Sequence, residues 1–248
     1  MAYSQFSFLP IHTSPTLLGL IGGTTTSANP TINLNLSGAF TKPSSSVTII
    51  IVLTLLSVAP SLLVMMTGFV RVSVVLSITR NALGLSAAPS NQVLAGLALF
   101  ISLFVMAPTL SQIDKVAIKP YMAGKITAVQ AYDAGQLPLK TWMLKQTNTT
   151  ELALFTQAGG EKPAKPIDVS LSALIPAFVL SQLRAAFIMG FVIYVPFLII
   201  DLVVSSALMS LGMMMLPPTL ISLPFKLLLF VLVDGWTLIA HSLLVSFR

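Results

Sequence analysis

The sequence contains no cysteine, and only two of its 248 residues are histidine, His12 and His241. Without thiols a chain forms no disulfide and carries out no thiolate chemistry, and it lacks the usual ligands of zinc and iron–sulfur sites. The two histidines lie near opposite ends of the chain, which favours two lone polar residues over a shared metal site. We therefore expect neither a metal ion nor any other cofactor.

Charge is also scarce. Charged residues make up 8% of the chain, 13 Lys and Arg against 7 Asp and Glu, whereas 55% of the residues are hydrophobic and the mean hydropathy is +0.93. Because a soluble domain carries about a quarter of its residues as charged ones, the composition indicates an integral membrane protein in contact with lipid. The pI of about 9.8 reflects how few acids there are. Such sparse positive charge is not typical of nucleic-acid binding, which we exclude.

The hydropathy pattern divides the chain into four regions. Residues 1–46 predict a flexible leader, and the apolar stretch Ser14–Gly23 within it is a poor signal peptide because no basic residue precedes it. Residues 47–110 and 171–248 predict two hydrophobic helical hairpins, the second with a Met/Pro tip. Residues 111–170, which hold most of the lysines, predict a small helical extramembrane (periplasmic) loop. We expect an all-α membrane protein with long, kinked helices and about four transmembrane-type segments.

The first apolar segment is longer than a bilayer requires. Val47–Val70 has no charge, and the residues after it are apolar enough to continue the helix as far as Gly84. A helix over residues 47–83 would be roughly 55 Å long at 1.5 Å per residue. The hydrocarbon core of a bilayer is about 30 Å thick, so part of such a helix must lie outside lipid.

The connection Ser210–Lys226 is too apolar to be a simple turn. It contains Met213, Met214 and Met215, followed by Pro217 and Pro218 at the expected hairpin tip. Irregular backbone in apolar sequence must be packed in protein or line a cavity, because lipid offers its N–H and C=O groups no partner. The methionines fit two interpretations: they fill a gap in a core, or they face a shared axis as a deformable seal.

Six charged side chains lie in or beside the apolar segments and are candidates for packing or subunit contacts, because an unpaired charge there costs about 2.5–3.5 kcal/mol. They are Arg71, Arg80, Arg184, Asp201, Lys226 and Asp234.

The two aspartates of this set allow two interpretations. Asp201 and Asp234 stand sixteen residues on either side of the proline pair, at similar depth in a hairpin, and Lys226 precedes Asp234 by eight residues, about two helical turns. Either acid can bond to a neighbouring base or amide, or the two can form an aspartyl protease dyad. No nucleophile elbow, phosphate-binding loop or zinc-protease motif indicates any other enzyme, and we predict a protein without catalytic activity.

Two long stretches resemble the FliP/SctR family of type III secretion export-gate subunits, and most closely its flagellar branch. They are MMTGFVRVSVVLSITRNALGLSAAPSNQVLAGLALFISLFVMAP (65–108) and FVIYVPFLIIDLVVSSALMSLGMMMLPPTLISLPFKLLLFVLVDGW (191–236). The loop stretch PLKTWMLKQT (138–147) is also similar to the family, and the resemblance covers roughly residues 47–248.

The resemblance implies a subunit of the flagellar protein export gate in the bacterial inner membrane, within the basal body. Five copies would assemble with FliQ and FliR into a conical helical channel, with FlhB at its cytoplasmic entrance. Unfolded flagellar proteins, including proximal rod components, would pass through its centre, and the gate would lie largely above the membrane plane. The family's methionine loop, which closes the pore, corresponds to Met213, Met214 and Met215.

The chain departs from the family pattern at two places. Where the family commonly has Ser-Glu-Leu-Lys, this chain has Ser181-Gln182-Leu183-Arg184, so a subunit contact through that acid is in doubt. The family also usually begins with a cleaved signal peptide, which residues 1–23 match poorly.

Two other classes of function remain open. A secondary transporter would use Asp201, Lys226 and Asp234 as an ion or proton site among broken helices. An intramembrane protease would use the two aspartates alone.

Overall fold

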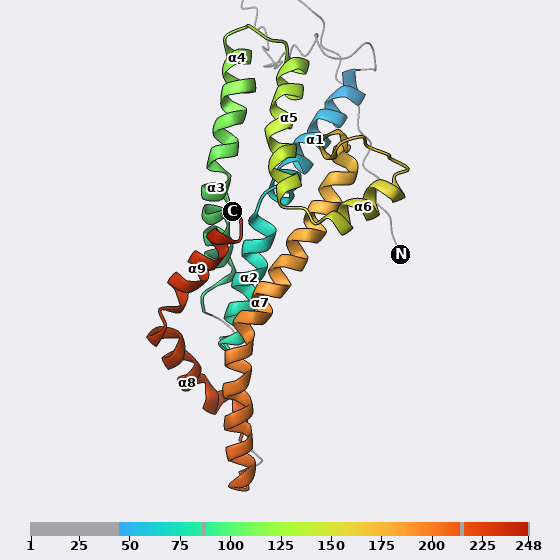
Figure 1. Ribbon diagram of the computed structural model, residues 1–248. Coiled ribbons are helices and arrows are strands. Elements are labelled where there is room, and N and C mark those ends of the chain that lie inside the picture. Colours follow the sequence, from blue (N-terminus) through green and yellow to red (C-terminus); the bar gives the residue numbers. More distant parts are fainter. Residues whose placement is uncertain (1–44, 86–87, 214–215, 248) are drawn as a thin grey trace, which may run out of the picture. The chain divides into compact units, whose positions relative to one another are not determined.

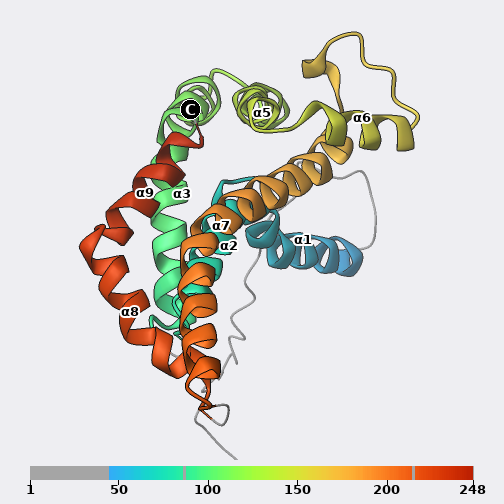
Figure 2. The same ribbon diagram turned by 60° about the horizontal axis from the view of Figure 1, so that its bottom comes forward.

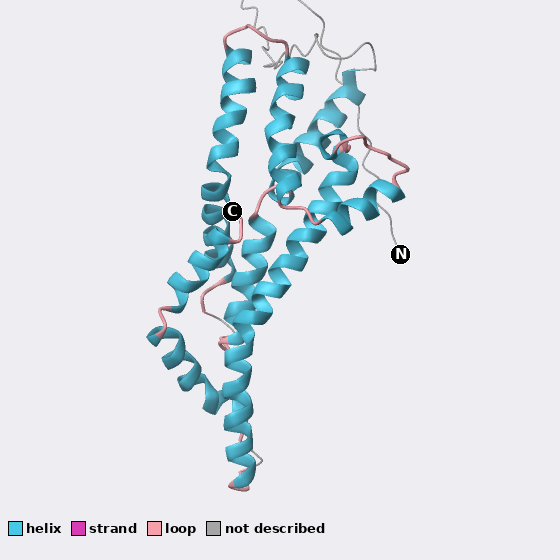
Figure 3. Cartoon of the chain, viewed as in Figure 1, coloured by secondary structure: helices cyan, strands magenta, loops and turns pink. Residues whose placement is uncertain are grey.

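The computed structural model describes residues 45–85, 88–213 and 216–247, and all regular structure among them is helical (Figure 3). The chain divides into two units at residue 48, and the described helices lie in the second unit, residues 49–248, apart from the first four residues of the first helix. The leader expected over residues 1–46 lies almost wholly outside the described residues. The helices are α1 (Ser45–Met65), α2 (Phe69–Ala82), α3 (Asn91–Ile113), a π-turn (Asp114–Ile118), α4 (Lys119–Met122), α5 (Ala128–Lys145), α6 (Thr149–Ala158), a 3-10 turn (Pro166–Asp168), α7 (Leu171–Ser210), α8 (Pro218–Leu232) and α9 (Gly235–Val245).

The expected all-α membrane class is confirmed. Two helices of the described chain are long and apolar enough to cross a membrane, Asn91–Met122 and Leu171–Ser210. The pair formed by α8 and α9 is bent by 63° and counts as a third if the pair makes one span. The fourth expected segment corresponds to α1.

The uninterrupted helix considered over residues 47–83 is wrong, because the chain turns at residues 66–68 between α1 and α2. The Thr67 hydroxyl donates to the carbonyl three residues earlier at 2.7 Å and accepts from the N–H two residues later at 3.3 Å, so it satisfies backbone groups that the turn frees. A Cβ on Gly68 would lie 2.8 Å from the ring of Phe247. The turn therefore makes room for an aromatic ring from the far end of the sequence.

The expected stop at Gly84 is confirmed. α2 ends two residues earlier, and Gly84 has a φ of +76°, which an L side chain rarely adopts. The N–H groups of Gly84 and Leu85 donate to the carbonyls of Asn81 and Arg80 at 3.0 and 3.3 Å. These two bonds satisfy carbonyls at the open end of α2.

The second apolar segment does not end near residue 110. α3 passes Pro108 and continues through the π-turn into α4, which gives one helix of 32 residues, Asn91–Met122. Pro108 removes one hydrogen bond of the helix but does not end it, and the polar residues after it are compatible with a helix. The expected boundary between the first hairpin and the polar region therefore falls inside a helix, which runs beside α5 (Figure 1).

The core lies where α2 packs along α7, and the two helices are side by side in both views (Figures 1 and 2). On α2, Val72, Val75 and Leu76 are at most 1% exposed, and on α7 Leu174 and Phe178 are fully buried. All five belong to one buried hydrophobic cluster. The contact between α2 and α7 thus joins the two hydrophobic halves of the chain.

Two side chains fix the start of α7. Ser170 caps the helix by accepting from the N–H of Ala173 at 3.3 Å, and the Glu161 carboxylate accepts from both the hydroxyl and the N–H of Ser170. These bonds, helped by the positive charge of Lys140, lower the pKa of Glu161 below its usual value. The long polar loop before α7 is therefore anchored at its end by an ionised carboxylate.

The close approach of α2 and α7 gives a test of this packing. A Cβ on Gly190 of α7 would lie 2.4 Å from Cδ1 of Ile78 on α2, so Gly190→Ala is expected to lower stability by about 1–3 kcal/mol through overpacking. The readout is the thermal unfolding midpoint of the detergent-solubilised protein. Adding Ile78→Val, which removes the nearest atom, should recover part of the loss.

The matched control is Gly96→Ala on α3, where an added Cβ meets nothing within 4 Å. This substitution should leave the midpoint unchanged or raise it slightly, because alanine favours the helix interior by roughly 0.5–1 kcal/mol. Equal midpoints for the two variants would contradict the packing described for α2 and α7.

Candidate functional site

A buried ion pair joins α7 to α8. Lys226 Nζ lies 2.6 Å from Asp201 Oδ2, and the Ser222 hydroxyl donates to Asp201 Oδ1 at 2.6 Å. Lys226 is 4% exposed and Ser222 is fully buried, and they stand four residues apart, hence on the same face of α8. Both carboxylate oxygens of Asp201 are thereby occupied. The structure brings together two of the expected charges, Asp201 and Lys226.

Asp234 takes no part in that pair. α8 ends at Leu232, and Asp234 precedes the first residue of α9 with a φ of +50°, at the 63° bend between the two helices, without a side-chain capping bond. The eight-residue spacing from Lys226 to Asp234 therefore does not place them on one helix face, because the helix ends between them. Gly235 follows, where a Cβ would lie 2.2 Å from the ring of Phe230, so the bend is packed closely against α8.

Arg71 is a buried cation held by residues from two distant parts of the chain. Its guanidinium donates to the carbonyl oxygen of Ser246 at 2.8 Å and to Gln146 Oε1 at 3.2 Å, and it lies 4.2 Å from the centre of the Phe247 ring. Gln146 Nε2 donates in turn to the carbonyl oxygen of Phe247 at 2.9 Å. Burial lowers the pKa of Arg71 to about 10, which leaves it protonated at neutral pH.

Gln182 extends this network to α7. It is fully buried, and its Nε2 donates to the carbonyl oxygen of Gln146 at 3.2 Å. The residue that replaces the family's acid thus bonds to backbone within the same chain.

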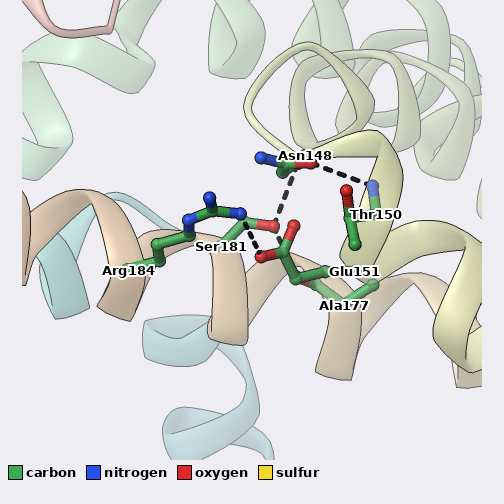
Figure 4. Close-up of polar contacts among 6 residues, drawn as sticks. All are labelled: Asn148, Thr150, Glu151, Ala177, Ser181 and Arg184. Atoms are coloured by element: carbon green, nitrogen blue, oxygen red, sulfur yellow. Dashed lines mark hydrogen bonds and ion pairs between the residues drawn. The ribbon is translucent and has the colours of Figure 1, made fainter.

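Arg184 forms a second link between elements, shown in Figure 4. Its Nη1 lies 3.0 Å from Glu151 Oε1 on α6. Nearby, the Ser181 hydroxyl accepts from the N–H of Asn148 at 3.0 Å and donates to the carbonyl oxygen of Ala177 at 2.8 Å. These contacts fix the start of α6 against the middle of α7.

Arg80 forms a contact with residues close to it in the sequence. Arg80 Nη1 donates to Asn91 Oδ1 at 2.6 Å and to the carbonyl oxygen of Pro89 at 3.2 Å, which holds the short connection between α2 and α3.

The methionine loop lies between α7, which ends at Ser210, and α8, which begins at Pro218. Met213 is 45% exposed, and Met214 and Met215 lie outside the described residues.

Several partners of these charges were not foreseen from the sequence. Ser222 carried a usable signal, because it precedes Lys226 by one helical turn. Gln146 and Ser246 carried none, since they stand 75 and 175 residues from Arg71 in the chain. In the described part of the chain, no group of three or more His, Cys, Asp or Glu side chains is placed to hold a metal ion.

Long apolar helices with many exposed large hydrophobic side chains, joined by ion pairs and a polar network, define an all-helical membrane protein. Comparison with protein families matches residues 52–243 to the FliP family. The chain belongs to the FliP family.

Relatives match nearly the whole chain. The flagellar biosynthetic protein FliP of Bacillus subtilis (strain 168) is 51% identical over 220 residues, which cover 88% of this chain and 100% of that protein. The protein of the same name from Pectobacterium carotovorum is 48% identical, covering 88% of each chain, and that from Caulobacter vibrioides is 45% identical, covering 89% of this chain and 84% of that one.

The contribution of the buried ion pair between Lys226 and Asp201 to stability can be measured. Lys226→Met is expected to cost about 3–5 kcal/mol of unfolding free energy, because it leaves the Asp201 carboxylate without its cation. The double variant Lys226→Met with Asp201→Asn should recover most of this loss. Thermal unfolding in detergent measures both effects.

The control is the exposed ion pair between Lys119 and Asp114, whose side chains are 69% and 39% exposed. Asp114→Asn should change stability by about 0–1 kcal/mol, as is usual for a surface pair. A Lys226→Met variant as stable as Asp114→Asn would show that the buried pair does not hold α8 to α7.

Proposed function

We propose that this protein is a core subunit of the flagellar type III protein export gate, in the bacterial inner membrane at the flagellar basal body. The observation that carries the proposal is membership of the FliP family along nearly the whole chain, with relatives named flagellar biosynthetic proteins. The long apolar helices support a position in or beside the membrane. The polar helical region 111–170 would form the extramembrane, periplasmic part.

The exposed apolar surface supports assembly with partners. On α7 alone, Phe187, Phe191, Val192 and Leu202 are each at least 60% exposed. A large apolar surface on one chain is covered either by lipid or by other subunits. In the proposed gate, about five copies pack with FliQ and FliR, with FlhB beside them, and unfolded flagellar proteins pass along the shared axis.

The methionine loop would close the pore. Met213, Met214 and Met215 follow the end of α7 and precede the proline pair that starts α8. Unbranched thioether side chains adapt to irregular shapes, which suits a seal that opens around a passing chain. Arg71, Arg80, Arg184, Asp201, Lys226 and Asp234 would then serve packing and subunit contacts.

This gate subunit would have no catalytic activity, and the energy for export would come from other components. A secondary transporter using Asp201, Lys226 and Asp234 is the alternative. The bonds of Asp201 to Lys226 and Ser222 fit a structural role at least as well as ion transport, because they occupy both carboxylate oxygens. The two proposals differ in what the purified chain does alone.

The mass of the detergent-extracted complex tests the proposal. A complex of five copies with smaller hydrophobic partners is expected, and deletion of this chain should stop secretion of rod and hook proteins until the wild-type chain is restored. A monomer or dimer that moves a small solute by itself in liposomes would instead favour the transporter.

Replacing all three methionines, Met213, Met214 and Met215, by alanine tests the seal. The resting membrane is expected to leak ions or small solutes several-fold more than wild type, because shorter side chains leave the constriction open. The extracted complex should keep its mass. Ion efflux from cells measures the leak.

The control is the pair of substitutions Met65→Ala and Met122→Ala, at exposed methionines on α1 and α4. These should leave the membrane as tight as in wild type. A triple variant that stays tight while its complex is assembled would rule out the methionine seal.

A further inference from the structure

Asp234 stands apart from the other acids of the chain. All seven Asp and Glu lie among the described residues, and six of them accept a side-chain hydrogen bond or ion pair or bond to a backbone N–H. Those six are Asp114, Asp133, Glu151, Glu161, Asp168 and Asp201. No side-chain hydrogen bond or ion pair among the described residues involves Asp234.

The surroundings of Asp234 make a free carboxylate costly. Val231, Leu232 and Val233 before it are 74%, 74% and 51% exposed, and Trp236 after it is 41% exposed. Any partner or lipid that covers these apolar side chains also removes water from the carboxylate, and an unpaired charge in such a place costs several kcal/mol. The left-handed backbone of Asp234 adds strain that a glycine would avoid. Asp234 is itself exposed in the single chain, so a cation from another chain could reach its carboxylate and offset the cost of covering it.

Positive charge is in excess over negative charge on the face formed by α2, α6 and α7. An open pocket of about 260 Å³ there is lined by five polar residues, Arg71, Gln146, Asn148, Ser181 and Arg184, and by the apolar residues Ala185 and Ile188. It contains two guanidinium groups but only one carboxylate partner, that of Glu151 on Arg184. Nε of Arg71 is buried and has no hydrogen-bond acceptor among the described residues.

The pocket is shaped to take an acceptor from outside. The side chain of Arg184 is 55% exposed, so one face of its guanidinium remains open beside the ion pair with Glu151 (Figure 4). Apolar side chains on α7 line part of the pocket, namely Ala185 and Ile188, and Ile188 is 58% exposed. A positive pocket inside an apolar rim matches a single carboxylate inside an apolar patch, which is the character of the α8–α9 bend.

We propose that this pocket binds the Asp234 carboxylate of a second copy of the chain. The contact joins two different surfaces, so repeating it from copy to copy builds a ring when the rotation closes. The inference rests on the proposed function, in which several copies assemble into one gate. It adds the polar contact that orients one copy on the next, with Arg184 as the cation that the carboxylate contacts and Arg71 as a buried positive charge behind it.

Cysteine cross-linking tests the contact directly, because the natural chain has no cysteine that would react in the background. Ile188→Cys lines the pocket and Val233→Cys adjoins Asp234, and both positions are exposed and leave the charged groups intact. Chains carrying one substitution each are co-expressed with the whole export apparatus and oxidised. A disulfide-linked dimer is expected only when both chains are present, since the bond requires Cα atoms within about 7 Å.

Two controls give the result its meaning. Met122→Cys in place of Ile188→Cys should give no dimer, because Met122 lies at the far end of α4. Asp234→Asn added to the Val233→Cys chain should lower the dimer yield about tenfold. If either cysteine blocks assembly, Phe187 and Leu232 offer neighbouring exposed positions for the same pair.

The possible outcomes distinguish failure of this contact from failure of the proposed function. Normal complex mass and normal secretion without a dimer would overturn the contact and leave the proposed function standing. An unchanged yield with Asp234→Asn, or a cross-link from Val233→Cys to a different subunit, would also overturn it. Phospholipid that co-purifies with wild type but not with Arg184→Gln would assign the pocket to a lipid phosphate instead. If the natural chain, without any cysteine substitution, neither assembles with the export apparatus nor supports secretion, the proposed function itself is wrong.

Discussion

The buried guanidinium of Arg71 is the interaction on which the arrangement of the helices depends. A charge that is 4% exposed loses most of its hydration, and it is retained only where several acceptors replace the lost water. Those acceptors come from Ser246 and Gln146, and the Phe247 ring covers the guanidinium at 4.2 Å. One side chain on α2 therefore fixes both the C-terminus and the end of α5, and the turn at Gly68 follows because Phe247 occupies that space.

The attachment of α8 to α7 depends on a different interaction. α8 is attached to α7 by the ion pair of Lys226 with Asp201 and by the packing of Phe230 against Phe197. The Ser222 hydroxyl bonds to the carboxylate oxygen of Asp201 that the lysine leaves open. Away from this point, α8 presents exposed residues such as Leu228 and Val231. These contacts hold one face of α8 against α7 and leave the rest of the helix uncovered. This arrangement suits an element whose remaining surface is completed by other chains.

Much of the fold could be predicted from hydropathy, and the elements that could not depend on distant residues. The helical class and the stop at Gly84 follow from local pattern. The charges of Asp201 and Lys226 inside apolar sequence mark them as candidates for pairing, although they stand 25 residues apart. The turn at residues 66–68 could not be predicted, because its cause is a ring 179 residues further along the chain. The partners of Arg71 were hidden for the same reason. The two-turn spacing from Lys226 to Asp234 misled because the helix ends between them.

Gln182 shows how this chain satisfies the network without the acid of the family pattern. A carboxylate at this fully buried position would face the carbonyl oxygen of Gln146, to which the Gln182 amide now donates at 3.2 Å. Two acceptors in contact repel, so an acid there would need a proton or a nearby cation. The amide supplies the donor and leaves only its own oxygen without a partner among the described residues. The side-chain oxygen of Gln146 accepts from Arg71, and no carboxylate among the described residues pairs with Arg71. Glu151 pairs with Arg184. With a neutral amide at position 182, the buried network of Arg71, Gln146 and Gln182 carries one positive charge and no acid among the described residues.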